Sequence, residues 1–369
     1  AMGCTEPIAL AFAAAKGREA LGAEPEKIIA KCSGNMIKNV RCVTIPNSGG
    51  LTGIETACIL GVVAGDVSAG MEVLEHVNDA GRKRTKELLE AGCCSVEYLD
   101  SEIPLHFIIL MESDGHTTEV EVRHTHTNIV SIAKDGEVIF KKPEELAKTG
   151  YTTDRSKLTL EAIKQFADEV DMELIRPIFE RQIRCNMDIA YEGISGNYGL
   201  GIGHVIRESY ADGVVTRMKA YAAAASEARM GGCDMPVIIN SGSGNQGIAS
   251  SVPVIVYARE KDIPTAKLYR ALAFSGLLTI YQKEFIGKLS AFCGAVSASC
   301  ASAAAITYVS GGTIEQIKAT IDNTLANIPG IICDGAKISC AAKIASSLDA
   351  SMMAHYLAMQ GKEYEAYTG

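Results

Sequence analysis

The chain has 369 residues and a formal net charge of -9, with 47% hydrophobic and 21% charged residues. This length allows two or three hydrophobic cores, or one large core with an insertion. The chain has no run of lysine and arginine with which to neutralise nucleic-acid phosphates, and no apolar stretch of about 18 residues with which to cross a bilayer. We therefore expect a soluble cytoplasmic protein without a nucleic-acid or membrane partner.

The N-terminal region, up to about Gly92, has a helical pattern. Apolar residues recur there at three- and four-residue spacing through residues 8–20, 52–63 and 71–89. Turn-forming clusters such as Ser48-Gly49-Gly50 separate the first two of these segments. We expect three helices with an irregular stretch over residues 32–53.

Between residues 95 and 140 the apolar period changes from 3.6 to 2. Runs rich in Val, Ile and Thr cover residues 106–112, 117–124, 129–133 and 137–140. The pairs Asp114-Gly115 and Asp135-Gly136 lie between these runs, and an Asp-Gly pair readily adopts the positive φ angles of a two-residue hairpin turn. The pattern predicts a small antiparallel sheet.

Helical periodicity returns after residue 158 and continues toward the C-terminal end. The predicted helices cover residues 161–180, 204–229, 266–285, 290–309, 314–326 and 340–357. Loops rich in Gly, Ser and Asn interrupt them at residues 193–203, 240–247 and 329–335. The predicted fold class is α+β: a mainly helical domain of residues 1–92 and 142–369, split by an inserted antiparallel sheet subdomain of residues 93–141.

Three of the twelve cysteines, Cys293, Cys333 and Cys340, have the spacing C-x39-C-x6-C, and each lies beside small residues. A thiolate that binds an iron–sulfur cluster needs small neighbours, backbone N–H groups near the sulfides and an apolar surrounding. Two alternatives stay open from the residues alone. The thiols could simply pack in a core, or they could bind zinc, which would need a fourth ligand.

Several segments together resemble one known family over essentially the whole chain, the L-cysteine desulfidases. These segments are Gly3-Cys-Thr-Glu-Pro-Ile, Asn35-Met-Ile-Lys-Asn, Asn240-Ser-Gly-Ser-Gly-Asn-Gln-Gly-Ile, Leu289-Ser-Ala-Phe-Cys-Gly-Ala and Gly330-Ile-Ile-Cys-Asp-Gly-Ala-Lys. More distantly, the C-terminal half is similar to the alpha domain of iron–sulfur L-serine dehydratases. The resemblance implies that Cys293, Cys333 and Cys340 hold a [4Fe-4S] cluster. Three protein ligands would leave one iron free to act as a Lewis acid.

The same resemblance makes Cys4 a catalytic residue, either a base or a fourth iron ligand that the substrate displaces. Thr5 and Glu6 belong to the same motif, and Pro7 suits the first turn of a helix. A thiol at a helix N-terminus has a lowered pKa. The alternative is an inert cysteine in a capping loop.

The segment His124-Thr-His126-Thr-Asn128 ends the second predicted strand. A period of two would place His124, His126 and Asn128 on one face. An imidazole such as that of His126 could bind the substrate carboxylate or move the Cα proton, because it titrates near neutral pH. The alternative is an ordinary exposed strand face. We predict His126 as catalytic and Asn128 as substrate-binding.

The loop at residues 240–247 offers amides, hydroxyls and a helix start expected after Gly247, all suited to an amino-acid carboxylate. It lacks the Gly-Lys-Ser/Thr ending of a phosphate loop. The predicted substrate-binding residues here are Ser241, Ser243, Asn245 and Gln246. The resemblance adds Thr5, Glu6, Asn35 and Lys38, although an ordinary turn and helix start would also account for the last two.

These residues predict a lyase that converts the amino acid L-cysteine to pyruvate, ammonia and hydrogen sulfide. Two alternatives stay open: an iron–sulfur L-serine dehydratase or related 2-amino acid ammonia-lyase, and a non-enzymatic metal or redox-sensing protein that uses the same thiols. The resemblance also implies a homodimer, and a helical segment before the Cys4 motif in relatives. We interpret the other cysteines as packing residues: Cys32, Cys42, Cys58, Cys93, Cys94, Cys185, Cys233 and Cys300.

Overall fold

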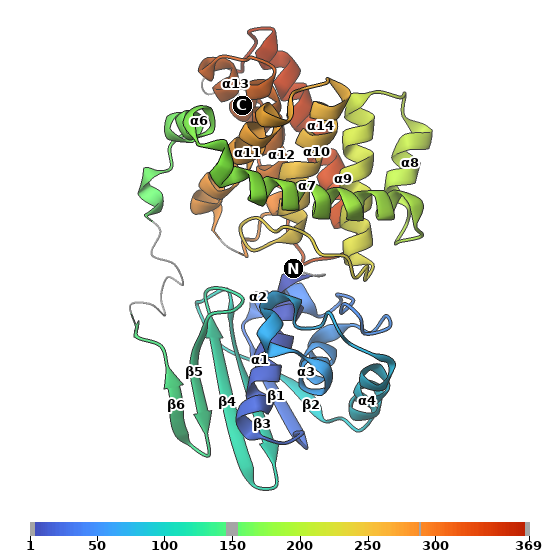
Figure 1. Ribbon diagram of the computed structural model, residues 1–369, viewed down its shortest axis with the longest axis vertical. Helices are drawn as coiled ribbons and strands as arrows, with labels where there is room; N and C mark the ends of the chain where they lie inside the picture. Colours follow the sequence, from blue (N-terminus) through green and yellow to red (C-terminus); the bar gives the residue numbers. More distant parts are fainter. Residues whose placement is uncertain (1–3, 145–153, 288, 366–369) are drawn as a thin grey trace. The chain divides into compact units, whose positions relative to one another are not determined.

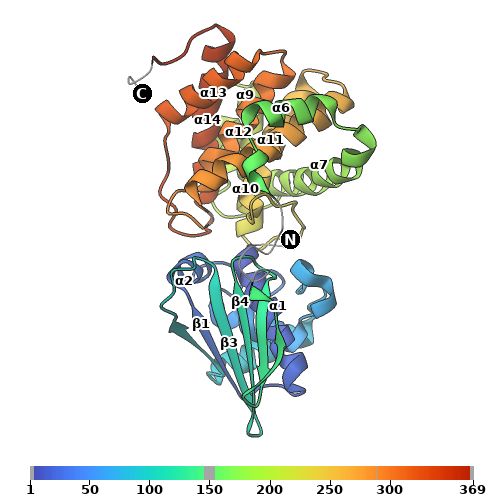
Figure 2. The same ribbon diagram turned by 90° about the vertical axis from the view of Figure 1, so that its left-hand side faces the viewer.

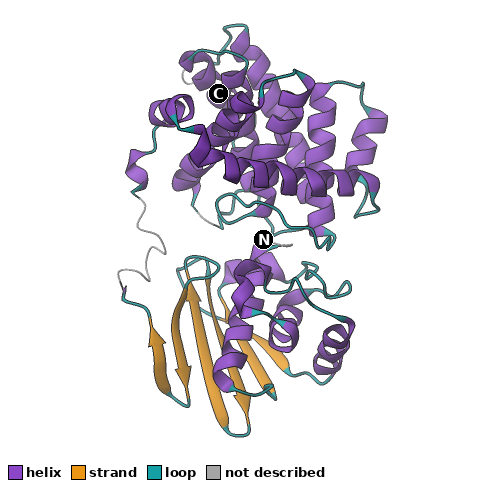
Figure 3. Ribbon diagram, in the orientation of Figure 1, coloured by secondary structure: helices purple, strands orange, loops and turns teal. Residues whose placement is uncertain are grey.

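The structure, a computed structural model, describes residues 4–144, 154–287 and 289–365 (Figure 1). The chain divides into two compact units. Unit 1 comprises Ala1–Thr153, Gly232–Asp234 and Asp334–Lys337, and unit 2 comprises Asp154–Gly231, Met235–Cys333 and Ile338–Gly369. Unit 1 contains the sheet and unit 2 is helical (Figure 3), so the predicted α+β fold class is confirmed.

The sheet of unit 1 has six strands in the order β2-β1-β3-β4-β5-β6 (Figure 1). The strands are β1 Lys27–Cys32, β2 Cys94–Tyr98, β3 His106–Ser113, β4 His116–Arg123, β5 Ile129–Lys134 and β6 Glu137–Lys141. The last four match the predicted strands to within one residue. Asp114 and Gly115 have φ angles of 50° and 77° in the β3–β4 hairpin, which are the positive values that its turn requires.

β1 makes the sheet mixed, because it pairs in parallel with β2 and antiparallel with β3. Its burial alternates, with Ile28, Ala30 and Cys32 inside and the residues between them more exposed. The sequence pattern did not separate this short strand from the helices around it. Because β1 lies inside the sheet, the N-terminal helices belong with the strands. The observed units therefore differ from the predicted division at residues 92 and 142.

The helices of unit 1 pack on the sheet and on each other. They are α1 Thr5–Leu21, α2 Gly34–Val40, α3 Gly53–Ala64 and α4 Asp79–Glu90, with a short 3₁₀ helix at Val67–Glu72. α1 contacts β3 and β4, and α3 contacts β1 and β2 (Figure 1). A Cβ atom at Gly61 of α3 would lie 2.3 Å from the carbonyl oxygen of Ala11 in α1, so the close helix pair requires glycine there. This packing fixes the N-terminal end of α1, where Cys4 and Glu6 lie.

Unit 2 is a bundle of helices around a buried central helix (Figures 2 and 3). The helices are α6 Leu160–Glu169, α7 Met172–Ser195, α8 Ile202–Ser209, α9 Val214–Met230, α10 Gly244–Glu260, α11 Thr265–Ile286, α12 Gly294–Val309, α13 Ile314–Asn327 and α14 Cys340–Met359, preceded by the 3₁₀ turn Arg155–Lys157. α12 contacts α10, α11, α13 and α14, and its residues from Ala295 to Thr307 are buried. Nearly all of them are small, which lets the neighbouring helices approach closely.

Two of the predicted helices are each divided in two. The predicted 161–180 segment breaks after α6, where the Asp171 carboxylate accepts a hydrogen bond from the backbone N–H of Glu173 and so caps α7. The predicted 204–229 segment breaks between α8 and α9, at a turn that contains Gly213. Among the described residues, no helix has both the length and the apolar character needed to cross a bilayer.

Candidate functional site

The three predicted cluster cysteines come together in unit 2. Backbone segments around Phe292 and Ile332 form a short antiparallel bridge, in which Cys293 N–H donates to Ile331 O and Cys333 N–H donates to Ala291 O, each at 2.7 Å. Residues on either side of a bridged pair point to the opposite face of such a ladder. Cys293 and Cys333 therefore share one face, while Phe292 and Ile332 take the other.

Helix starts and small residues surround these thiols. Cys293 is the N-cap residue of α12, and Cys340 is the first residue of α14. The N-terminal end of a helix carries partial positive charge and unpaired N–H groups, which favours thiolates and sulfides. A Cβ atom at Gly330 would lie 2.7 Å from the Phe292 ring. Glycine at this position lets the two bridged segments approach and so brings the cysteines together.

The electrostatics of Cys293 agree with this arrangement. Contact with the Cys333 thiol, followed by burial, raises the pKa of the Cys293 thiol far above its usual range, and the charge of Cys340 acts in the same direction. Three adjacent thiolates would repel one another, so the metal-free site favours protonated sulfur. A bound metal reverses this preference, because a coordinating thiol is deprotonated.

Lys283, in the last turn of α11, is a residue of this site that the sequence analysis missed. Its side chain is 4% exposed. Burial lowers the pKa of Lys283, whereas the nearby Cys293 and Cys333 thiols oppose that shift. No sequence signal pointed to it, because it lies ten residues before Cys293 and outside the segment Leu289–Ala295 that resembles the family.

The loop at residues 240–247 is a tight turn followed directly by a helix. Asn240 and Ser243 exchange two backbone hydrogen bonds of 3.1 and 2.9 Å, and Ser241 and Gly242 between them have φ angles of 48° and 81°. Ser243 is the N-cap residue of α10, so the helix begins at Gly244, earlier than the predicted start after Gly247. The turn therefore presents Ser241 and Ser243 at a helix N-terminus.

The side chains of Asn245 and Gln246 differ in their hydrogen bonds. The Asn245 Oδ1 atom accepts hydrogen bonds from Ser226 Oγ and from the buried Arg229 guanidinium, both at 3.1 Å. Gln246 is 8% exposed, and among the described residues its Oε1 atom has no hydrogen-bond partner. A Cβ atom at Gly294 would lie within 2.6 Å of the Gln246 carboxamide. Gln246 thus reaches the residue that follows Cys293.

A second constellation lies in unit 1, around the buried carboxylate of Glu6. The Cys4 thiol and the Thr5 hydroxyl each donate to Glu6 Oε2 at 3.0 Å, and Asn39 Nδ2 donates to Oε1 at 3.2 Å. His126 Nε2 lies 3.9 Å from Oε1, which is an ion-pair distance rather than a hydrogen bond. Burial opposes ionisation, but His126 and then Cys4 outweigh it and hold the pKa of Glu6 at about 2.

This constellation joins predicted residues from distant parts of unit 1. Cys4 is the N-cap residue of α1 and Glu6 lies in its first turn, where a carboxylate is favoured. His126 comes from the β4–β5 connection. The charged carboxylate of Glu6 orients a thiol and approaches an imidazole, an arrangement that can hold or move protons. Asn39 completes it and was not among the predicted site residues.

The expectation that His124, His126 and Asn128 share a strand face is wrong. β4 ends at Arg123, and His124 has a φ of 68°, which breaks the strand alternation. Asn128 is 3% exposed; its Nδ2 atom donates to Arg123 O at 2.8 Å and its Oδ1 atom accepts from Lys142 Nζ at 2.6 Å. Asn128 thus ties the β4–β5 connection together, and its role in substrate binding stays a prediction.

Asn35 and Lys38 lie in α2, the seven-residue helix of unit 1, and both side chains are half-buried. The segment Asp334–Lys337, which follows Cys333, belongs to the same unit and packs against this helix. A Cβ atom at Gly335, whose φ is 103°, would lie 2.3 Å from Lys38 O. Glycine in the Cys-Asp-Gly-Ala-Lys motif is therefore required by the close approach of two backbones.

Residues 68–368 match the family described as "Serine dehydratase alpha chain". The chain belongs to this family. It is also similar to curated relatives named UPF0597 protein. The one from Lachnoclostridium phytofermentans is 48% identical over 364 residues, which cover 99% of this chain and 87% of the relative. The one from Treponema denticola is 46% identical over 375 residues, which cover 100% and 87%.

Serine dehydratase alpha chains are iron–sulfur lyases, so the family implies an iron–sulfur cofactor and a lyase. The donor set of unit 2 fits such a group, since it has three thiols, helix N-termini and the buried Lys283 ammonium. Among the described residues, no group of three or more His, Cys, Asp or Glu side chains is arranged to hold a single metal ion. A structural zinc site would in addition need a fourth ligand.

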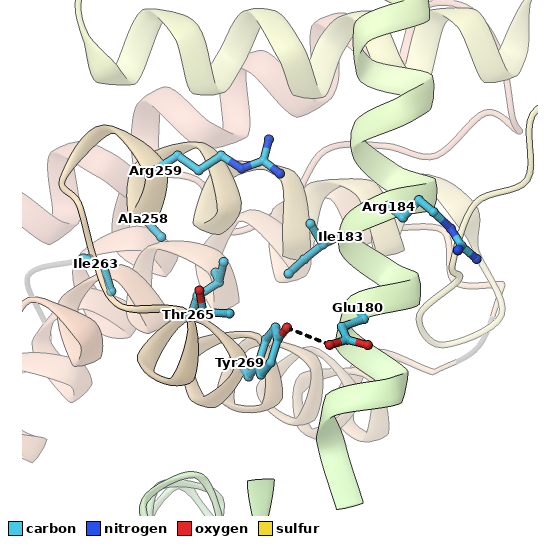
Figure 4. Close-up of a pocket in the computed structure, with 9 residues that line it drawn as sticks. Glu180, Ile183, Arg184, Ala258, Arg259, Ile263, Thr265 and Tyr269 are labelled. Atoms are coloured by element: carbon cyan, nitrogen blue, oxygen red, sulfur yellow. Dashed lines mark hydrogen bonds between the residues drawn. The ribbon is translucent and has the colours of Figure 1, made fainter. Parts of the chain in front are cut away.

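Unit 2 also has a surface pocket of about 440 Å³ that includes none of the predicted site residues (Figure 4). α7, the end of α10 and the start of α11 line it. Arg184 and Arg259 are among its lining residues, and the Tyr269 hydroxyl points to Glu180 at 3.5 Å. Both arginines are exposed, so this pocket is open to solvent. It shares no lining residue with the thiol site.

Unit 1 contains a further group of neighbouring thiols, which was not predicted from the sequence. The neighbouring Cys94 thiol of β2, followed by burial, raises the pKa of the Cys58 thiol in α3 well above its usual value. Cys32 lies near both. α3 packs across β1 and β2, which brings cysteines from three separate elements to one side of the sheet.

Proposed function

We propose that this protein is a [4Fe-4S]-dependent lyase that eliminates hydrogen sulfide from L-cysteine and forms pyruvate and ammonia. The observation that carries the proposal is the meeting of Cys293 with Cys333 and Cys340, which come from distant parts of the sequence. Membership of the serine dehydratase alpha chain family supports the reaction class. The resemblance of the motifs to L-cysteine desulfidases supports the substrate.

Cys293, Cys333 and Cys340 would hold the cluster through their sulfur atoms. When bound, the cluster supplies an iron without a protein ligand, which is a Lewis acid with affinity for a departing sulfur. Cys340 is 6% exposed, whereas Cys293 and Cys333 are partly accessible to solvent. The helix N-termini at Cys293 and Cys340 favour the negative charge of thiolates.

The elimination requires a base for the Cα proton of the substrate. The proposal assigns proton transfer to Cys4 and His126, because Glu6 is charged at neutral pH and too weak a base for the task. The Glu6 carboxylate orients the Cys4 thiol by accepting its hydrogen bond. Loss of the Cα proton and of the β-thiolate leaves an enamine, which hydrolyses to pyruvate and ammonia.

The proposal assigns the substrate carboxylate to the turn at residues 240–247. Ser241, Ser243 and Gln246 lie at the N-terminus of α10. Within the part of the chain that the structure describes, Gln246 Oε1 has no hydrogen-bond partner. Backbone N–H groups at such a helix start bind carboxylates. Asn245 is held by the Arg229 guanidinium and would keep the first turn of α10 in place.

L-serine is a second candidate substrate, because the matching family is described by serine dehydratase. Its leaving group would be hydroxide or water instead of sulfide. The two substrates share the amino and carboxyl groups, so the turn at residues 240–247 would bind both. Only the leaving group distinguishes them, and iron accepts sulfur and oxygen ligands alike.

The test is anaerobic reconstitution with iron and sulfide, followed by assays of pyruvate and sulfide with L-cysteine and with L-serine. We expect a bound cluster and equal amounts of pyruvate and sulfide from L-cysteine. Pyruvate formed from L-serine alone would establish the second candidate. A cluster without turnover of either amino acid would refute the lyase. Cys333→Ser should abolish both products, whereas Cys300→Ser, a matched change of a buried thiol in α12, should retain them.

A further inference from the structure

Two polar atoms beside the Glu6 carboxylate are buried and have no hydrogen-bond partner within residues 4–144, 154–287 and 289–365. They are Asn39 Oδ1 and His126 Nε2. Asn39 is 6% exposed, and Glu6 is equally buried. Buried polar atoms of folded proteins are nearly always hydrogen-bonded, so two exceptions next to one carboxylate require a physical explanation. A ligand that donates hydrogen bonds here would supply a missing partner.

The Asn39 amide is held in one orientation by Glu6. Its Nδ2 atom donates to Glu6 Oε1 at 3.2 Å, while the Cys4 thiol and the Thr5 hydroxyl donate to Oε2. Turning the amide over would place its oxygen against a carboxylate oxygen, and neither atom can donate. The backbone is enclosed as well, because a Cβ atom at Gly335 would lie 3.4 Å from Asn39 Cα. Asn39 Oδ1 therefore remains an acceptor beside the carboxylate.

The chemistry of these atoms favours a small cation with several N–H donors. Glu6 Oε1 and Asn39 Oδ1 are both acceptors, and the negative charge of the carboxylate strengthens hydrogen bonds from a positively charged donor. His126 Nε2 lies 3.9 Å from Glu6 Oε1, and a neutral imidazole can accept at this nitrogen. A primary ammonium group has three donors and fits such a set. A carboxylate or phosphate would meet acceptors and a like charge.

We propose that Glu6 and Asn39 bind the ammonium group of the amino-acid substrate, with Glu6 Oε1 and Asn39 Oδ1 as its acceptors. This inference deepens the proposed function and rests on it for the class of substrate. The ammonium is bonded to Cα, so its binding at Oε1 brings the Cα proton toward Cys4, which hydrogen-bonds to the other oxygen of the same carboxylate. The two acceptors also select 2-amino acids over carboxylic acids of the same skeleton.

The test compares L-alanine with propionate, which lacks only the ammonium group. Neither has a β leaving group, so neither can be eliminated, and ligand-observed NMR titration of the reconstituted, anaerobic protein gives both dissociation constants. The parent should bind L-alanine at least about tenfold more tightly than propionate, and Asn39→Leu should lower this ratio about tenfold, since a hydrogen bond to a charged donor is lost. Equal weakening of both ligands would indicate a merely structural residue and overturn the inference.

Asn323→Leu is the matched control. Asn323 is a buried asparagine in α13, and both atoms of its amide are paired: Nδ2 donates to Lys362 O at 2.9 Å, and Oδ1 accepts from the backbone N–H of Tyr364 at 3.0 Å. The control should leave the ratio of the two dissociation constants unchanged. If Asn39→Leu does not fold, as judged by circular dichroism, Asn39→Ala carries the same test.

A free monovalent cation would offer the same charge, so thermal unfolding is also measured in potassium chloride and in sodium chloride. Stabilisation of the parent by potassium that is lost in Asn39→Leu, with equal binding of L-alanine and propionate, would assign the site to an inorganic cation and overturn the inference. A parent that does not bind L-alanine overturns it too. Turnover of L-cysteine with an unchanged ratio in Asn39→Leu overturns the ammonium site and leaves the lyase intact. An Asn39-dependent ratio in a protein that forms no pyruvate supports the ammonium site and overturns the lyase.

Discussion

Replacing Glu6 with glutamine removes a buried negative charge on which three donors converge. Cys4, Thr5 and Asn39 donate to its two oxygens, and His126 lies 3.9 Å away. The neutral carboxamide of glutamine has the same shape, but its NH₂ group cannot accept the hydrogen bonds that one of the two carboxylate oxygens accepts. The variant therefore isolates the electrostatic contribution of the carboxylate to the stability of unit 1.

The magnitude follows from the difference between the folded and unfolded states. The pKa of Glu6 is about 2 in the folded protein, whereas an unperturbed glutamate, as in the unfolded chain, has a pKa of 4.5. Each pKa unit corresponds to about 1.4 kcal/mol, so the charged carboxylate contributes about 3 kcal/mol at neutral pH. Because the folded pKa is lowered, this contribution is complete above pH 4.5 and disappears as the pH falls through 2. At pH 3 it should be about 1.4 kcal/mol.

Hydrogen-exchange mass spectrometry of peptides from α1 measures the opening free energy of this part of unit 1. Glu6→Gln should lower it by about 3 kcal/mol at pH 7 and by about half as much at pH 3. Glu19→Gln is the matched control, since Glu19 lies in the same helix and forms an exposed ion pair with Lys16. Exposed pairs contribute about 0.5 kcal/mol. A Glu6→Gln effect below about 1 kcal/mol, or one independent of pH, would show that the reasoning about this carboxylate is mistaken.

Three other changes test the site and the packing. Cys333→Ser should lower the iron content after anaerobic reconstitution, while Cys300→Ser should bind iron like the parent; equal iron in both would rule out Cys333 as a ligand. Gly193→Ala should destabilise unit 2 by at least about 2 kcal/mol in urea unfolding followed by circular dichroism. The reason is that its Cβ would lie 2.2 Å from a carbonyl oxygen of α9. The control Gly213→Ala meets nothing within 4 Å and should leave the free energy of unfolding nearly unchanged. Thr307→Val should cost about 1–3 kcal/mol in the same assay, because it leaves a buried histidine nitrogen 2.8 Å away without its partner; an unchanged midpoint would contradict this.

The thiol site combines features that are local in sequence with one that is not. Cys293 and Cys333 each carry their own small neighbours, and the glycine at position 330 permits the bridge between their segments. The small residues are visible in the sequence because they lie beside each cysteine in the chain, whereas the contact between Gly330 and Phe292 depends on the fold. Lys283 was invisible, because its role depends on where the end of α11 meets those segments. A lysine in sequence is most often a solvated charge.

Strand β1 shows the same limit in the fold. Its six residues alternate in burial only because β2 and β3 flank them, and the local pattern resembles the helices on either side. His124 is a second case. The alternation of apolar residues predicts a strand through this position, but the β4–β5 connection turns there with a positive φ, a conformation that depends on the residues packed around it.

The sequence by itself determined the α+β class, the two Asp-Gly hairpins, most helix bounds and the cysteine motifs, because all of these depend on interactions within a few residues of the chain. Only the tertiary structure decided that the N-terminal helices join the sheet, that Glu6 gathers Cys4, Asn39 and His126, and that the bridge between the segments of Cys293 and Cys333 forms. Those features depend on contacts between residues far apart in the chain, which burial and charge select only when the whole unit is folded.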